Sequence, residues 1–281
     1  MAEYDLVVIG SGPAGEKGAA QAGYFHKKVA VVERLSLLGG AGANTGTLPS
    51  KTLRETSLFL SGFRQRGLYG VDMRLEARTG VRELLFRERA VAQEEQVRVA
   101  QNLRSHGADV YQGKGRLLDA NTVLVRRPGA EERLSAKLIL IATGSTPFHP
   151  PLFNFSAPGV YDSDSILLMS EVPHSLVVVG GGVIGCEYAC TFAALGIPVT
   201  LVEARTPLLS FLDLEMSTRL KARMEGLGVQ FRMPATVESV EVEEGRVTVG
   251  LNGGDSPPPR RSWWPRDGAP TPPAWGWRRR E

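Results

Sequence analysis

Two glycine-rich segments of the same design constrain the fold of this 281-residue chain more than any other feature. The first is GSGPAG at 10–15, which lies between the apolar runs YDLVVI (4–9) and VAVVE (29–33). The second is GGGVIG at 180–185, again between two apolar runs, SLVVV and VTLVE. Because strand, glycine turn, helix and parallel strand form one βαβ unit, the sequence predicts an α/β fold with two Rossmann-like dinucleotide-binding domains.

The first segment has the residues that dinucleotide binding needs. Gly10 allows the tight turn, Gly12 lets a pyrophosphate approach the backbone, and Gly15 lets helix and strand pack closely. The helix N-terminus supplies N–H groups and a positive dipole end for the phosphates. Glu33, 23 residues after Gly10, can accept hydrogen bonds from an adenosine ribose. The alternative is a coincidental glycine turn.

The second segment repeats this logic with Gly180, Gly182 and Gly185, and Glu203 follows Gly180 by 23 residues. Glu203 suits the free 2′-hydroxyl of NAD, whereas Arg205 could meet the 2′-phosphate of NADP. Arg205 is alternatively a plain surface arginine. Two complete fingerprints in one chain indicate two cofactors that exchange a hydride.

Several motifs resemble the pyridine nucleotide–disulfide oxidoreductase family. They are GSGPAG, GTLPSK at 46–51, ATGSTP at 142–147 and GGGVIGCEYA at 180–189, and the similarity runs over residues 4–252. The resemblance implies a glutathione-reductase-like flavoprotein with FAD at the first fingerprint and NAD or NADP at the second. PFHP, VYDSDSIL and LLSFLDLEMS are similar to the family's soluble transhydrogenases, which pass a hydride between NADPH or NADH and NAD(P)+ through the flavin. Alternatives are a dihydrolipoyl-dehydrogenase-like or diaphorase-type oxidoreductase, or an inactive nucleotide-binding fragment.

One departure from the family pattern bears on chemistry. The family carries a redox disulfide in a GGxCxNxGCxPSK pattern, where this sequence has GGAGANTGTLPSK. Gly42 and Thr47 stand at the two cysteine positions, and neither can form a thiolate. Dithiol–disulfide exchange at this place is excluded, whereas hydride transfer through a flavin needs no cysteine.

Two charged residues are candidate catalytic groups by resemblance. Lys51 would lie near the flavin N5 region and pair with Glu187, favouring negative charge on the flavin. A solvated surface charge is the alternative for each. The residues expected to bind FAD and NAD or NADP are Gly10, Gly12, Pro13, Ala14, Gly15, Glu33, Arg34, Gly39, Gly40, Gly42, Gly46, Thr47, Lys51, Gly115, Thr143, Gly144, Gly180, Gly182, Val183, Ile184, Gly185, Glu187, Glu203 and Arg205. For Gly115 a plain turn is the alternative.

The sequence predicts three regions: an FAD-binding domain over 1–150, an incomplete NAD(P)-binding domain over 151–254 and a tail over 255–281. The tail has seven prolines and no Leu, Ile, Val, Phe or Met, which favours disorder. Full-length family members continue further and close with a dimerisation domain, so the chain reads as C-terminally truncated. Apolar spacing predicts helices over 47–66 and 80–106.

Composition and charge limit the kinds of partner that the chain is expected to bind. The tail carries six arginines and three acids, which leaves 27 basic and 27 acidic residues before it, so no nucleic acid partner is expected.

The N-terminal apolar run is too short for a signal peptide or membrane span. Two cysteines four residues apart in a helix fit a cytoplasmic protein without disulfides. The four histidines lack metal-ligand spacing, so no metal site is expected. A homo-oligomer is expected only for the full-length family member.

Overall fold

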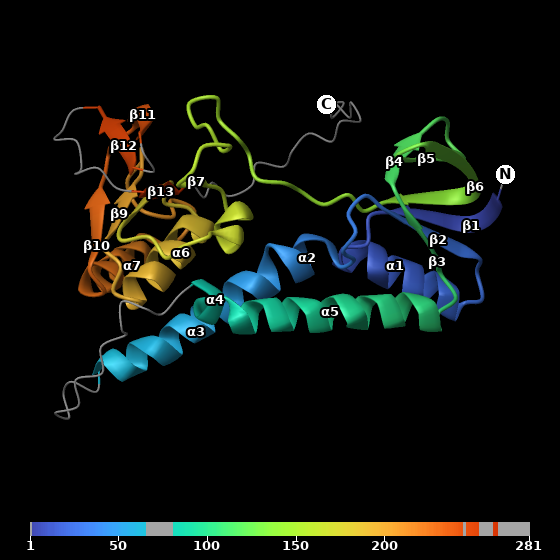
Figure 1. Ribbon diagram of the computed structural model, residues 1–281, viewed down its shortest axis with the longest axis horizontal. Coiled ribbons are helices and arrows are strands. Elements are labelled where there is room, and N and C mark those ends of the chain that lie inside the picture. The colour runs from blue at the N-terminus through green and yellow to red at the C-terminus, as the bar shows by residue number, and fades with distance from the viewer. Residues whose placement is uncertain (1, 66–80, 244–245, 253–260, 264–281) are drawn as a thin grey trace. The chain divides into compact units, whose positions relative to one another are not determined.

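The computed structural model describes residues 2–65, 81–243, 246–252 and 261–263 (Figure 1). The chain divides into two compact units, Met1–Pro49 with Glu88–Ser145, and Ser50–Arg87 with Thr146–Glu281. This division differs from the expected boundary at residue 150, because residues 50–87 group with the second unit. Two helices, α3 (Thr47–Gln65) and α5 (Phe86–Ser105), therefore begin in one unit and end in the other.

The first unit is built on a six-stranded sheet in the order β3-β2-β1-β6-β5-β4. Its strands are β1 (Ala2–Ile9), β2 (Val29–Glu33), β3 (Asp109–Gln112), β4 (Lys114–Leu117), β5 (Thr122–Arg127) and β6 (Ala130–Ile141). The pairings from β3 to β6 are parallel, whereas β4, β5 and β6 pair antiparallel. Helix α1 (Pro13–Tyr24) connects β1 to β2 and completes the expected βαβ unit, and the short α2 (Gly40–Asn44) follows.

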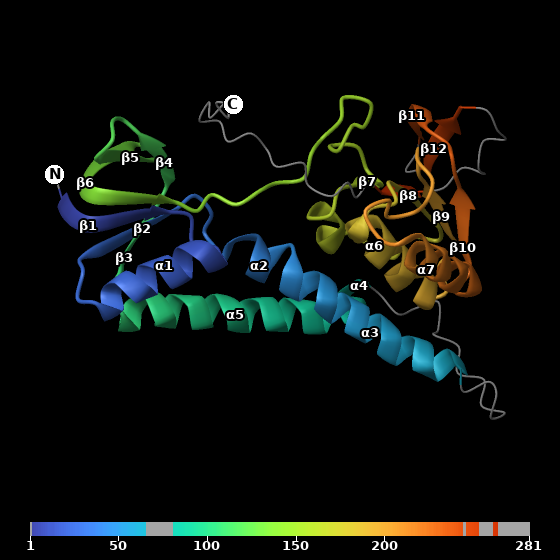
Figure 2. The same ribbon diagram turned by 180° about the vertical axis from the view of Figure 1, so that it is seen from behind.

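Both faces of the central strands are covered, which explains their continuous apolar sequence. Alternate side chains point to opposite faces of a strand. Val8 packs on one side with Leu103 of α5, and Figures 1 and 2 show α1 and α5 lying side by side on this face. Val7 and Ile9 pack on the other side with Val125 of β5. The antiparallel extension of the sheet thus closes the second face.

The second unit repeats this plan around a parallel sheet in the order β10-β9-β8-β13-β7. Its elements are α4 (Val81–Leu84), β7 (Val160–Tyr161), the 3₁₀ helix Ser165–Leu168, β8 (Leu176–Val179), α6 (Val183–Ala194), β9 (Val199–Val202), α7 (Leu214–Gly226), β10 (Val229–Arg232), the hairpin β11 (Val237–Glu243) and β12 (Arg246–Leu251), and β13 (Arg261–Trp263). This arrangement confirms the predicted α/β fold with a second Rossmann-like unit.

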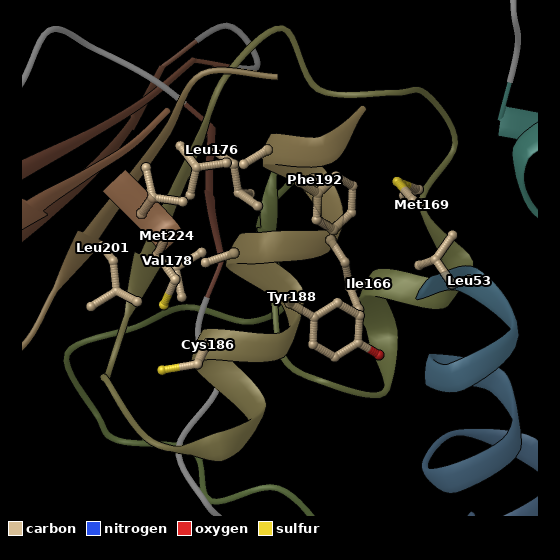
Figure 3. Close-up of a cluster of buried hydrophobic side chains, with 14 of the residues drawn as sticks. Leu53, Ile166, Met169, Leu176, Val178, Cys186, Tyr188, Phe192, Leu201 and Met224 are labelled. Carbon is tan, nitrogen blue, oxygen red and sulfur yellow. The ribbon is translucent and has the colours of Figure 1, made fainter. Parts of the chain in front are cut away.

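The larger core lies between this sheet and its helices (Figure 3). Phe192 of α6 and Met224 of α7 are fully buried, together with Leu201 of β9. Leu53 of α3 is also fully buried in this cluster, which explains why residues 50–87 belong to the second unit. On the opposite face, Val177 packs with β12 of the hairpin.

Part of the tail differs from the sequence expectation. Residues 261–263 form β13, which pairs in parallel with both β7 and β8, so the prediction of disorder is wrong for these three residues. Backbone N–H and C=O groups make the ladder of a strand, and such a ladder needs no aliphatic side chain. The other residues of 255–281 lie outside the described part of the chain.

The long helix predicted over 80–106 is interrupted. Helix α4 ends at Leu84 and α5 begins at Phe86. Leu84 and Leu85 are both buried while Phe86 is 70% exposed. The break lets two consecutive leucines enter the core of the second unit before the chain turns into α5.

Candidate functional site

The first glycine loop has the close approaches that its sequence predicts. Gly10 has a φ of +106°, and its N–H donates to the carbonyl of Val32 at 2.8 Å. A Cβ added at Gly10 would lie 2.2 Å from the carbonyl oxygen of Ala142, and one at Gly15 would lie 1.9 Å from the Gly10 oxygen. Only glycine therefore fits either position, and the loop is held against the carboxyl ends of β1 and β6.

Glu33 is buried at the end of β2, and its carboxylate binds the loop. Its Oε2 accepts from the backbone N–H of Ser11 at 2.9 Å and from the Ser11 hydroxyl at 2.7 Å. Its Oε1 accepts from the N–H of Leu35 at 3.0 Å. The structure thus brings Glu33 to the fingerprint loop and orients the carboxylate by three donors, and its contact with an adenosine ribose stays a prediction.

The segment after β2 also approaches the loop. Gly40 has a φ of +56°, and an added Cβ there would lie 2.8 Å from the Cα of Gly12. A Cβ at Gly42 would lie 2.9 Å from Cγ of Pro13. A cavity of about 240 Å³ lies beside this segment, and its lining includes both Gly42 and Thr47. The two positions that carry cysteines in the family pattern therefore face one cavity in this chain, without a thiol.

The second loop has the same geometry as the first. Gly180 has a φ of +112°, and its N–H donates to the carbonyl of Val202 at 2.7 Å. Glu203, at the end of β9, accepts from the N–H of Gly181 at 2.6 Å. Its other oxygen accepts from the N–H of Arg205 at 2.9 Å and lies 3.5 Å from Arg205 Nε. The Arg205 side chain is 77% exposed.

In both loops the helix begins directly after the third residue of the fingerprint, which is its N-cap. Gly12 is the N-cap of α1 and Gly182 is the N-cap of α6, and neither has a side chain that could cap the helix. The first-turn N–H groups of these helices are the donors that an anionic pyrophosphate requires. Pro13 and Ala14 are exposed in the first loop, as is Val183 in the second.

Lys51 and Glu187 form an ion pair within the second unit. Lys51 lies in the first turns of α3, and Glu187 lies on α6, whose Thr191 hydroxyl donates to the Glu187 carbonyl at 2.8 Å. The side chains are 49% and 36% exposed, respectively, so both are accessible to a ligand. The pairing expected from the family resemblance is thus present, and its catalytic role stays a prediction.

Cys190 lies one turn beyond Glu187 on the same helix. Burial raises the pKa of its thiol, the positive charge of Arg54 acts in the opposite direction, and Glu187 raises the pKa further. The thiol is therefore held in its protonated, unreactive form.

Four further predicted residues lie outside the two glycine loops. Thr143 and Gly144 follow β6 and are exposed, and Arg34 is exposed beyond Glu33. Gly115 lies in β4, where an added Cβ would lie 3.1 Å from Ile9 and 3.3 Å from Val32. Packing of β4 over β1 and β2 therefore accounts for this glycine, and a contact to FAD stays a prediction.

Two features were not singled out from the sequence. Ser11 occupies a variable position of the fingerprint, and its buried hydroxyl links Glu33 to the N–H of Gly39. Glu16 is 2% exposed and accepts from Asn102 at 2.6 Å, with Arg98 at 3.4 Å. The polar residue between two fingerprint glycines was the only available signal for Ser11. Glu16 could have been found as an acid on the buried side of a short helix.

Among the described residues, no group of three or more His, Cys, Asp or Glu side chains is arranged to hold a metal ion. His149 instead stacks on Phe155 and makes a 2.6 Å hydrogen bond with Asp162. None of the described helices is long and apolar enough to cross a membrane.

Two Rossmann-like units, each with a glycine loop tied to a glutamate at the end of a strand, place the chain in the class of α/β proteins with a repeated dinucleotide-binding fold. Residues 4–258 match the family described as pyridine nucleotide-disulphide oxidoreductase. The chain belongs to this family.

Its relatives include the soluble pyridine nucleotide transhydrogenase of Mycobacterium bovis (strain BCG / Pasteur 1173P2), which is 44% identical over 260 residues, 92% of this chain and 56% of that protein. The protein of the same name from Colwellia psychrerythraea is 38% identical over 253 residues, 90% of this chain and 54% of that protein. A solved structure of the HOCl-induced flavoprotein disulfide reductase RclA from Escherichia coli, as its Cu(II) complex, matches with a TM-score of 0.82 and 27% identity. That match covers 95% of this chain and 57% of the other. The chain thus spans little more than half the length of these proteins.

Proposed function

We propose that this chain holds FAD at the first loop and NAD or NADP at the second, as part of an FAD-dependent NAD(P) transhydrogenase. The observation that carries the proposal is the repetition of one loop geometry, in which Glu33 binds the N–H of Ser11 and Glu203 binds the N–H of Gly181. The relatives named soluble pyridine nucleotide transhydrogenase support the same function.

The residues of the first loop fit FAD. The backbones of Gly12 and Gly40 approach so closely that a Cβ at Gly40 would clash, which leaves bare peptide groups for a diphosphate to approach. Glu33 keeps acceptor capacity beyond its three donors for the hydroxyls of the adenosine ribose. Bound there, FAD supplies a group that takes a hydride from one nicotinamide nucleotide and gives it to another.

Lys51 and Glu187 have separate roles in this proposal. Lys51 provides a fixed positive charge that favours electron-rich forms of the flavin ring. Glu187 holds the ammonium in place through the ion pair. The carboxylate is therefore a positioning group, and Lys51 is the group expected to act on the cofactor.

The chain lacks the groups that a disulfide reductase needs at this site. Gly42 and Thr47 line the cavity where the family pattern has two cysteines. A chain without these thiols cannot pass electrons to a disulfide there. A nicotinamide nucleotide is the acceptor that we propose, because hydride transfer through the flavin requires no protein thiol.

The test uses the complete 281-residue chain, purified and supplied with FAD. We expect a flavin absorption band that remains after desalting, and transfer of a hydride from NADPH to a thionicotinamide analogue of NAD. A chain that stays colourless would contradict the FAD assignment. Reduction of a dye by NADPH without transfer to the NAD analogue would favour a diaphorase-type reductase instead.

We propose further that the protein is cytoplasmic and that the longer family member is a homo-oligomer. The word "soluble" in the relatives' names supports the first point. Fractionation of cells that produce the native protein tests it, and recovery in the membrane or secreted fraction would contradict it.

A further inference from the structure

The Ser11 hydroxyl uses both of its hydrogen-bonding functions in a completely buried place. Ser11 is 0% exposed. Its Oγ donates to Oε2 of Glu33 at 2.7 Å and accepts from the N–H of Gly39 at 3.1 Å. One side chain therefore connects the fingerprint loop, the end of β2 and the segment that precedes α2.

These three segments are the parts of the first unit that would surround FAD. Gly40, next to Gly39, is the residue whose backbone approaches Gly12 of the loop. The Ser11 hydroxyl thus links the fingerprint loop, which contains Gly12, to the segment of Gly39 and Gly40. The same hydroxyl orients the Glu33 carboxylate. A site whose walls are already in place loses less conformational freedom when its ligand binds.

The second fingerprint offers an internal comparison, because Gly181 stands where Ser11 stands in the first. Gly181 donates its N–H to Glu203 in the same way, but glycine has no hydroxyl. A Cβ at Gly181 would lie 2.6 Å from Cδ1 of Leu208 and 3.1 Å from Cγ of Glu203. A side chain at Gly181 would therefore have to displace the end of the Leu208 side chain.

The two carboxylates are otherwise held in the same way. The second oxygen of Glu203 accepts from the backbone N–H of Arg205 at 2.9 Å, and the corresponding oxygen of Glu33 accepts from the backbone N–H of Leu35 at 3.0 Å. The bond from the Ser11 hydroxyl to Glu33 is therefore the main difference between them, beside the 3.5 Å approach of Arg205 Nε to Glu203.

We propose that Ser11 is a positioning residue that makes the first loop a site for a retained dinucleotide, whereas the second loop, with Gly181, suits a dinucleotide that binds and leaves. This proposal rests on the proposed function, in which FAD stays bound while the nicotinamide nucleotides exchange. Hydrogen bonds to a charged group are among the stronger ones in proteins, so loss of the hydroxyl has a measurable effect on binding.

The experiment compares Ser11→Ala and Ser11→Gly with the wild-type chain at full length. FAD affinity is measured by flavin fluorescence, and NADPH affinity is measured separately on each variant. We expect FAD binding to weaken about ten- to a hundredfold, and NADPH binding to change less than about twofold. Ser57→Ala is the matched control, because Ser57 is 1% exposed and its hydroxyl donates to the Leu53 carbonyl at 2.9 Å. The control should leave FAD affinity unchanged.

A second measurement distinguishes positioning from general packing. If the hydroxyl acts through Glu33, Ser11→Ala should cost less FAD affinity in a Glu33→Gln background than in the wild-type background. Equal costs in both backgrounds would overturn the proposed link.

The other outcomes are equally decisive. Wild-type FAD affinity in Ser11→Ala, or equal weakening of FAD and NADPH, would overturn the role of Ser11 and leave the proposed function standing. Loss of the folded state in both variants, seen by circular dichroism, would overturn it too, since the second loop folds with glycine at this place. A wild-type chain that binds no FAD would instead refute the proposed function, and the role of Ser11 with it.

Discussion

Replacement of Arg205 by alanine should separate the two nicotinamide nucleotides. Arg205 lies two residues beyond Glu203, and among the described residues its side chain approaches the Glu203 carboxylate at 3.5 Å. With the side chain 77% exposed, this pair contributes about 0–1 kcal/mol to stability, so the variant should fold normally. An effect on nucleotide binding can then be assigned to the lost contact with the ligand.

The size of the effect follows from the charge of the ligand. Only NADP(H) carries a 2′-phosphate, and a hydrogen bond between charged groups contributes about 1.5–3 kcal/mol. Since 1.4 kcal/mol corresponds to a tenfold change in affinity, NADPH should bind about 10- to 150-fold more weakly to the Arg205→Ala chain. NADH, with a free 2′-hydroxyl, should bind within about twofold of the wild type. The NADPH affinity of the wild-type chain should also fall with added salt, and that of the variant should fall less.

Calorimetric titration of both nucleotides into the complete chain measures these values. Arg219→Ala is the matched control, because Arg219 is 76% exposed and forms a similar surface ion pair with Glu215 at 2.7 Å. The control should change neither affinity. Equal weakening of NADPH and NADH by Arg205→Ala would show that Arg205 does not contact the 2′-phosphate.

Gly15→Ala places a Cβ 1.9 Å from a carbonyl oxygen, so FAD binding should be lost and the midpoint of urea unfolding should fall by the equivalent of about 1–3 kcal/mol; unchanged binding would contradict the close packing. Lys51→Met should slow hydride exchange about ten- to a hundredfold in single-turnover measurements while FAD stays bound, and an unchanged rate would show that the ion pair is only structural. Burial raises the pKa of Asp162, but hydrogen bonds from Ser165 and His149 outweigh it and hold the pKa below its ordinary value. The ionised carboxylate therefore stabilises the fold above about pH 4, and this stability is lost as the pH falls through the lowered folded-state pKa. Asp162→Asn should be less stable than wild type at about pH 6, and urea unfolding at successively lower pH should show the difference shrinking below about pH 4; a constant difference would contradict the role of the charge.

The fold and the main residues of the candidate site could be predicted because their cause is local. Gly10, Gly15 and Glu33 have the spacing of one βαβ unit, and the structure shows the steric and hydrogen-bonding reasons for each. The Ser11 hydroxyl could not be predicted in the same way. Its acceptor, Glu33, belongs to the fingerprint, but its donor, the N–H of Gly39, lies 28 residues away in a segment that no repeating pattern links to the loop.

Other differences also come from tertiary packing. Gly115 lies in β4, which packs closely over Ile9 and Val32. The local sequence around Gly115 does not indicate this contact. The helix predicted over 80–106 is broken because two adjacent leucines enter a core formed largely by residues more than 80 positions later. Residues 261–263 pair with β8 through backbone hydrogen bonds, and the side-chain composition of the tail does not predict this pairing.

The interleaving of the two units has a consequence for how the chain reaches its native state in the cell. The first unit cannot close until Ser145 has left the ribosome, because its sheet needs β6. Leu53 and its neighbours in α3 are made early, yet Phe192, with which they share a core, is made about 140 residues later. At a synthesis rate of about 5–20 residues per second, this apolar face of α3 stays exposed for several seconds or longer before the residues that bury it are made. Neither unit can therefore be produced separately as one continuous segment, because each is made of two stretches of the chain.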